Sequence, residues 1–237
     1  MKAEKDPMGA AIRDYHKTGK ASRLKVFSPD FDEDEIPVPT LFRKFAEMPS
    51  LERIALEKAE GRILDVGAGS GCHSLALQEM GKTVEACDIS PLSCETMRER
   101  GVKVVREEDF FQMKGEQFDT ILMLMNGSGI VGRIERLGEF FLHIRQLLAD
   151  DGSLYMDSSD LRYLYEEEDG SFMIDLNDDY YGELEFQMQY KNIKGDLFPW
   201  LYIDFNTLQM YAEDNGFHAE IVHEGDHYDY LARIWKE

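Results

Sequence analysis

The chain has 237 residues, of which 43% are hydrophobic and 31% are charged, and this suits one folded domain with a full core. Aspartate and glutamate outnumber lysine and arginine by 47 to 26, and the resulting net charge of −21 argues against a nucleic-acid partner. The three cysteines suggest neither a disulfide framework nor a metal site, and no apolar run predicts a membrane span or a signal peptide. We therefore expect a reduced, cytoplasmic protein without a bound metal.

The first part of the chain is polar. Residues 1–39 include an acidic run that leads into Pro37 and Pro39. This composition predicts an arm that contains little helix and ends in a turn.

A second N-terminal segment has a different character. Residues 40–59 carry apolar side chains at helical spacing, with Thr40 as a possible N-cap, and predict a helix. Pro49 should break this helix or open a second one. We interpret residues 1–59 as an arm with a lid helix, and residues 60–237 as the main domain.

Short apolar strands and helices alternate in the next hundred residues. Strands are predicted at 62–66, 83–87, 102–105, 118–125 and 153–157, and helices at 72–80, 91–100 and 133–148. Such alternation predicts a mostly parallel sheet covered by helices on both faces.

The alternation then stops and later resumes. Residues 160–200 are rich in aromatic and acidic side chains and predict a β-rich insertion that is too short for a core of its own. Within it, strands are predicted at 183–190 and, less clearly patterned, at 171–176. The chain closes with a helix at 204–215, capped by Gly216, and with two strands at 217–223 and 228–235 that should form an antiparallel pair.

A glycine loop between the first predicted strand and its helix is the most specific motif. It reads D-V-G-A-G-S-G from Asp65 to Gly71, with Gly67 and Gly69 between. Glycine has no Cβ, so a ligand can approach the backbone closely at the strand end, where the next helix presents its positive N-terminus. The dinucleotide fingerprint G-x-G-x-x-G is not met, because its sixth position is Cys72.

This D-x-G-x-G-x-G pattern resembles the class I S-adenosylmethionine-dependent methyltransferases. The resemblance covers about residues 60–160 and has a second mark at Asp88, which ends the second strand and opens the sequence D-I-S-P. An acid at this place can accept hydrogen bonds from both ribose hydroxyls, although nicotinamide-dependent enzymes use the same device.

Two further marks follow the third and fourth predicted strands. In the family, an acid and the next backbone N–H after the third strand contact adenine, and Asp109 with Phe110 fits this place, with Glu108 as the alternative. The fourth strand ends beside the methyl group, at Met125 and Asn126.

The resemblance implies a fold, a cofactor and a set of binding residues. The fold would be α/β: a doubly wound, Rossmann-like, mostly parallel seven-stranded sheet with an antiparallel last strand, plus an N-terminal helical lid and a β-rich insertion. The cofactor would be S-adenosyl-L-methionine. Its predicted binding residues are Asp65, Gly67, Ala68, Gly69, Gly71, Asp88, Ile89, Asp109, Phe110, Met125 and Asn126. No catalytic residue is assigned.

The methyl acceptor is predicted to be a small molecule. The sequence N-G-S-G from Asn126 lacks the D/N-P-P-Y/F motif of enzymes that methylate nucleic-acid amines, and the acidic charge agrees with this. A non-catalytic protein that binds the cofactor and an NAD-dependent oxidoreductase are the alternatives. The oligomeric state is left open.

Several residues outside the core could contact the acceptor. They include Asp14, Tyr15, His16, His223, His227, Tyr228 and some aromatic residues of the insertion, whereas His73 is expected to pack at a helix start. The polar arm and the apolar helix after it predict a lid that closes over the site and excludes water. The alternative is a helix that covers one face of the sheet behind a disordered tail.

Overall fold

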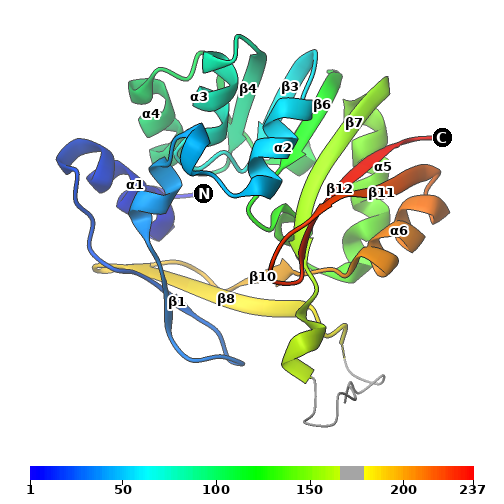
Figure 1. Cartoon of the computed structure of the whole chain (residues 1–237). Helices are drawn as coiled ribbons and strands as arrows, with labels where there is room; N and C mark the ends of the chain where they lie inside the picture. Colours follow the sequence, from blue (N-terminus) through cyan, green and yellow to red (C-terminus); the bar gives the residue numbers. More distant parts are fainter. Residues whose placement is uncertain (166–178) are drawn as a thin grey trace.

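The computed structural model describes residues 1–165 and 179–237, and these form two β-sheets (Figure 1). The larger sheet has the strand order β11-β12-β7-β6-β3-β4-β5. Its strands are β3 (Arg62–Val66), β4 (Thr83–Asp88), β5 (Val105–Glu107), β6 (Phe118–Met123), β7 (Leu148–Ser159), β11 (Phe217–Glu224) and β12 (Asp229–Lys236). The helices around it are α2 (Ser50–Lys58), α3 (Cys72–Glu79), α4 (Pro91–Arg100), α5 (Leu137–Leu147) and α6 (Phe205–Asp214).

The larger sheet confirms the predicted fold class. Strands β5, β4, β3, β6 and β7 are parallel, and β12 joins β7 in the antiparallel sense. The side chains of β6 alternate between two buried layers: Ile121 and Met123 pack with α5 and α6, whereas Leu122 packs with α2 and α3. Burial on both faces explains why the second half of β6, residues 121–123, is continuously apolar in sequence.

The smaller sheet joins segments from opposite ends of the chain. It has the order β10-β8-β1-β2, with β9 paired to β8, and every described pairing in it is antiparallel. Its strands are β1 (Leu24–Phe27), β2 (Asp34–Ile36), β8 (Glu183–Tyr190), β9 (Ile193–Lys194) and β10 (Phe198–Leu201). Figure 1 shows β1 and β8 running side by side beneath the larger sheet. The insertion is β-rich as predicted, while its proposed strand at 171–176 lies outside the described residues.

The prediction that residues 1–39 contain little helix was wrong. Helix α1 (Pro7–Thr18) begins after Asp6, whose carboxylate accepts a hydrogen bond from the Gly9 N–H at 2.8 Å, and it ends at Gly19 in the left-handed conformation. A proline in the first turn and a glycine after the last turn are ordinary helix boundaries. The helix is stabilised by packing against α4 and β8, which buries Ala10 and Ala11.

Other predicted boundaries needed correction. In place of the predicted helix at 40–59, the structure has the two 3-10 turns Val38–Phe42 and Phe45–Glu47, followed by α2. Helix α2 begins directly after Pro49, in agreement with the expectation that this proline could open a second helix. Thr40 lies inside the first turn and is not an N-cap. The strand predicted at 102–105 starts only at Val105, and the helix predicted at 133–148 starts only at Leu137, after another 3-10 turn.

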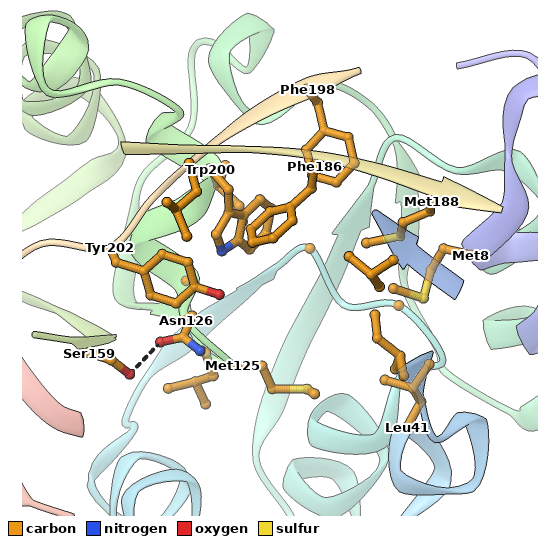
Figure 2. A pocket seen from close by; sticks show the side chains of 18 of the residues that line it. Met8, Leu41, Met125, Asn126, Ser159, Phe186, Met188, Phe198, Trp200 and Tyr202 are labelled. Atoms are coloured by element: carbon orange, nitrogen blue, oxygen red, sulfur yellow. Dashed lines mark hydrogen bonds between the residues drawn. The ribbon is translucent and has the colours of Figure 1, made fainter. Parts of the chain in front are cut away.

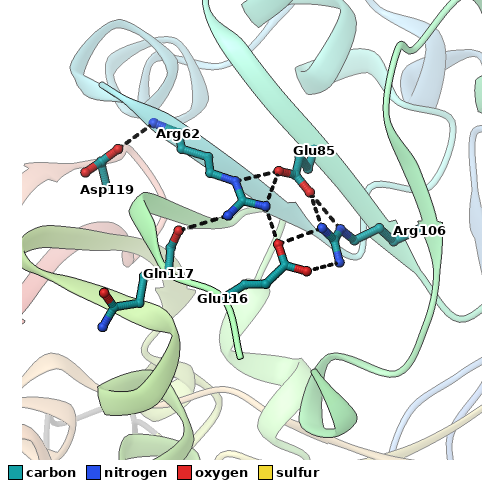
Figure 3. A network of polar contacts seen from close by, with 6 residues as sticks. All are labelled: Arg62, Glu85, Arg106, Glu116, Gln117 and Asp119. Atoms are coloured by element: carbon teal, nitrogen blue, oxygen red, sulfur yellow. Dashed lines mark hydrogen bonds and ion pairs between the residues drawn. The ribbon is translucent and has the colours of Figure 1, made fainter. Parts of the chain in front are cut away.

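A network of ion pairs joins β3, β4 and β5 (Figure 3). Glu85 on β4 bonds both Arg62 on β3, at 2.6 Å, and Arg106 on β5, at 2.7 Å. Glu116 contacts the same two arginines from the loop before β6. Because every charge has two partners, the network keeps three parallel strands in register at low electrostatic cost.

No helix among residues 1–165 and 179–237 is long and apolar enough to cross a membrane.

Candidate cofactor and acceptor site

A cavity of about 750 Å³ lies between the ends of the parallel strands and the smaller sheet (Figure 2). One wall comes from the segments that follow β3, β4 and β6, and the opposite wall comes from β1, β2, β8 and β10. Helix α1 adds Met8 and Ile12 to the lining. The carboxyl edge of a doubly wound sheet is where such folds bind ligands, and the volume falls within the roughly 300–1,000 Å³ typical of small-molecule sites.

The glycine loop forms the floor of this cavity. Gly67 and Gly69 have φ of 69° and 57°, which is the left-handed region that favours glycine, and both line the cavity together with Ala68. The N–H groups of Gly67 and Ala68 donate to the carbonyl of Cys87 at the end of β4, so the loop is held in place. A Cβ on Gly69 would meet no protein atom closer than 3.9 Å and would point into space that a ligand can use.

Gly71 has a different role from the other two glycines. A Cβ on Gly71 would lie 2.9 Å from side-chain atoms of Met97 and Val102, so this position must be glycine for packing. It does not line the cavity. Its contact with the cofactor therefore stays a prediction.

Asp88 ends β4 and lines the cavity beside the glycine loop. Its carboxylate accepts hydrogen bonds from the N–H groups of Gly69 and Ser90, each at 2.8 Å, which orients both oxygens and leaves each a free lone pair. Burial raises the pKa of Asp88 to about 6, although the two N–H groups oppose this shift. Ile89, exposed at 46%, lines the cavity beside it.

Asp65 is buried behind the glycine loop rather than on the cavity wall. Its carboxylate accepts a hydrogen bond from the Ser74 hydroxyl at 2.6 Å and lies 3.9 Å from Nδ1 of His73. His73 bonds Glu52 at 2.8 Å, and Glu52 pairs with Arg43. This buried chain connects α2 and the segment before it to the start of α3.

His73 is the member of this chain that reaches the cavity lining. Burial alone would lower its pKa, but the hydrogen bond to Glu52 and the nearby Asp65 raise it. The expectation of a packing residue is met, because His73 is 4% exposed and lies at the start of α3.

Asp109 and Phe110 lie away from the cavity lining. The Asp109 carboxylate caps a short 3-10 turn by accepting from the Phe111 N–H at 3.0 Å, and Phe110 is buried against Phe140 and His143. Their contact with adenine, and the alternative role of Glu108, stay predictions.

The loop after β6 has a strained backbone that is held by hydrogen bonds to side chains of β7. Met125 and Asn126 have φ of 69° and 57°, a conformation that non-glycine residues rarely adopt in succession. The carboxylate of Asp157 accepts from the N–H groups of Met125, at 3.0 Å, and Gly127, at 2.9 Å. The side chain of Asn126 accepts from the Ser159 hydroxyl at 3.0 Å (Figure 2).

Asp157 holds this loop in place, and the sequence analysis did not single it out. It is 7% exposed at the carboxyl end of β7, and burial raises its pKa to about 6. The available signal was an acid directly after the apolar residues Leu154, Tyr155 and Met156. Ser159, whose hydroxyl donates to Asn126, was also missed, because it lies beyond the predicted strand at 153–157.

The opposite wall is aromatic. Figure 2 shows Phe186, Trp200 and Tyr202 across the cavity from Met125 and Asn126. The Trp200 ring lies so close to Gly129 that a Cβ there would be 1.8 Å from it, so Gly129 seats the indole. This agrees with the expectation that some aromatic residues of the insertion line the pocket.

Of the other residues proposed to contact the acceptor, only some line the cavity. His227 lines the cavity, whereas Tyr15, His16, His223 and Tyr228 do not. Asp14 also lies elsewhere, because its carboxylate bonds Lys191 and the Tyr190 hydroxyl. The N-terminal segment supplies cavity wall, and its opening and closing as a lid stays a prediction.

Comparison with known proteins agrees with this geometry. The family described as "Methyltransferase domain" matches residues 64–156. A crystal structure of an S-adenosylmethionine-dependent methyltransferase from Bacteroides fragilis, in complex with S-adenosyl-L-homocysteine, is 63% identical, with a TM-score of 0.94 over 100% of this chain and 97% of that one.

Two more distant proteins are also similar. A protein of Staphylococcus carnosus named "Uncharacterized methyltransferase" is 28% identical over 219 residues, covering 90% of this chain and 97% of its own. The CcbJ methyltransferase of Streptomyces caelestis shares the fold, with a TM-score of 0.61 and 13% identity over 97% of this chain and 98% of that one. With the glycine loop, Asp88 and the relative from B. fragilis in agreement, this chain belongs to the S-adenosylmethionine-dependent methyltransferases.

Proposed function

We propose that this methyltransferase transfers the methyl group to a small molecule that binds between the glycine loop and the smaller sheet. The observation that carries the proposal is the cavity itself, which has a wall opposite the cofactor-binding segments. That wall closes off the strand ends, where a macromolecule would have to approach the methyl group. Its aromatic lining and its volume suit a small organic acceptor.

We assign roles within the cavity as follows. Gly67, Ala68 and Gly69 would lie against the amino-acid and ribose parts of the cofactor, Asp88 would accept from the ribose hydroxyls, and Ile89 would pack on adenine. Asp65 and Gly71 would act from behind the loop, by fixing its shape.

The reaction needs alignment more than acid-base chemistry. When bound, S-adenosylmethionine supplies a methyl group that its sulfonium already activates. Asp157 fixes the backbone at Met125 and Asn126, next to the place where the methyl group would lie, and the aromatic wall excludes water and holds the acceptor in line. No residue is assigned as a general base.

A fractionation experiment tests this proposal. Protein, tritium-labelled S-adenosylmethionine and an extract of B. fragilis are incubated, and the label is followed into metabolite, protein and RNA fractions. We expect labelled metabolites only. Label in intact protein or RNA, with none in metabolites, would overturn the small-molecule assignment.

A further inference from the structure

The inner face of the smaller sheet carries a consistent set of side chains. Strand alternation directs Val26, Asp34, Met188, Phe186 and Trp200 to the cavity. These residues lie next to one another across the strands, because Val26 pairs with both Asp34 and Met188. On the other side of β8, Phe186 pairs with Phe198, which also lines the cavity. This face is therefore a continuous surface of aromatic, thioether and carboxylate groups.

The β1–β2 hairpin carries ion pairs on one side and, among the described residues, unpaired acids on the side that faces the cavity. Lys25 pairs with Glu33 at 2.8 Å, and Arg23 pairs with Glu35, so these ion pairs lie on the side away from the cavity. Asp32 and Asp34 line the cavity instead, and neither forms an ion pair with any described residue. Both are exposed to solvent, so they can attract a cation before it is buried.

In the described part of the chain, the basic side chains of the cavity lining are two histidines, His73 and His227. Among residues 1–165 and 179–237, no lysine or arginine lines it, and the sequence from 166 to 178 contains neither residue type. A carboxylate, phosphate or phosphonate acceptor would lose hydration beside Asp32 and Asp34 without a lysine or arginine to pair with, which is costly. A cation would instead find carboxylates at the entrance and the faces of Phe186, Trp200 and Tyr202 inside.

We propose that the methyl acceptor is an amine attached to an apolar or planar body, and that its nitrogen is the atom methylated. The inference rests on the proposed function and narrows its substrate class. The bound ammonium first gives one proton to solvent, and the unprotonated nitrogen then attacks. The N–CH₃ bond forms as the S–CH₃ bond breaks, so the sulfonium becomes a neutral thioether and the methylated product is an ammonium. Positive charge moves from sulfur to nitrogen and stays within the same anionic, aromatic cavity.

Three probes of one size test the charge preference without knowledge of the natural acceptor. They are 2-phenylethylamine, 2-phenylethanol and phenylacetate, added to protein saturated with S-adenosylhomocysteine. Binding is read from the indole N–H signals, because Trp200 lines the cavity and Trp235, on β12, does not and serves as an internal reference. We expect the amine to shift the Trp200 signal and to bind about tenfold more tightly than phenylacetate.

Charge-neutral variants sharpen the test. Asp34→Asn, alone and with Asp32→Asn, should weaken amine binding a few-fold, and Glu33→Gln on the other side of the hairpin should not. Stronger binding of phenylacetate, equal binding of all three probes, or no Trp200 shift with any probe would overturn the amine assignment. Calorimetry with S-adenosylhomocysteine alone comes first, because failure at that step would refute the proposed function rather than the acceptor class.

Discussion

The two walls of the cavity are built in different ways. The cofactor wall uses short contiguous segments at the ends of neighbouring parallel strands, with Asp88 bonded directly to Gly69 of the glycine loop. The acceptor wall uses strands from opposite ends of the chain, which meet where β1 pairs with β8. The cofactor wall therefore depends on local backbone geometry, whereas the acceptor wall depends on the pairing of strands that are far apart in sequence.

The largest effect is expected at Gly69. Gly69→Val adds bulk where the backbone meets the ligand and forces a β-branched residue into φ of 57°, so affinity for S-adenosylhomocysteine should fall about a hundredfold or more by calorimetry. Gly81→Val is the matched control, because Gly81 has φ of 78° and no atom near its Cβ position. If the Gly69 variant is folded and binds normally, the cofactor wall has been misplaced.

The next largest effect is expected at Asp88. Asp88→Ala removes two charge-assisted hydrogen bonds to ribose and should cost roughly 2–4 kcal/mol of cofactor affinity. The affinity of Asp109→Ala for the cofactor is measured in parallel. A loss of affinity would support the predicted contact of Asp109 with adenine, although Asp109 does not line the cavity. Unchanged affinity in a folded Asp88→Ala protein would mean that the ribose is held elsewhere.

A smaller effect is expected where the two walls touch. Gly129→Ala would displace the Trp200 ring and should lower the free energy of unfolding by about 1–3 kcal/mol, measured by urea denaturation. Methyl transfer should fall while affinity for S-adenosylhomocysteine stays near normal, because the glycine loop is untouched. Equal losses of methyl transfer and of affinity for S-adenosylhomocysteine would show that the two walls do not act independently.

The smallest effect is a dependence on pH. Since the pKa of Asp88 is raised from 3.8 to about 6, its neutral form is favoured in the free protein, and the stability that this provides is present below 3.8 and lost as pH rises through 6. Ribose hydroxyls donate to the ionised form, so cofactor affinity should weaken as pH falls through 6. We expect up to about tenfold per pH unit below 6.

Calorimetry of wild type and Asp88→Asn on both sides of pH 6 checks this. The dependence should be smaller in the variant. A similar dependence in both proteins would assign the titration to another group such as Asp157, whose pKa is also raised to about 6.

The sequence by itself determined the doubly wound sheet and the glycine loop at the end of its first strand. Apolar strands such as β6 alternate with helices, and the spacing of Gly67 and Gly69 after Asp65 limits what the loop can bind. These signals are local: strand burial, positive φ and a strand-end acid leave their marks within a few residues. The same local signals misplaced the limits of β5 and α5, because boundaries depend on packing that a window of sequence does not contain.

Only the tertiary structure decided the acceptor wall and the supports behind the site. Helix α1 was overlooked because its stability comes from packing of Ala10 and Ala11 on α4 and β8 rather than from a strong apolar pattern. The pairing of β1 with β8, and the hydrogen bonds from Met125 and Gly127 to Asp157, join residues far apart in sequence. Such contacts form only when the whole chain has folded, so no short motif predicts them.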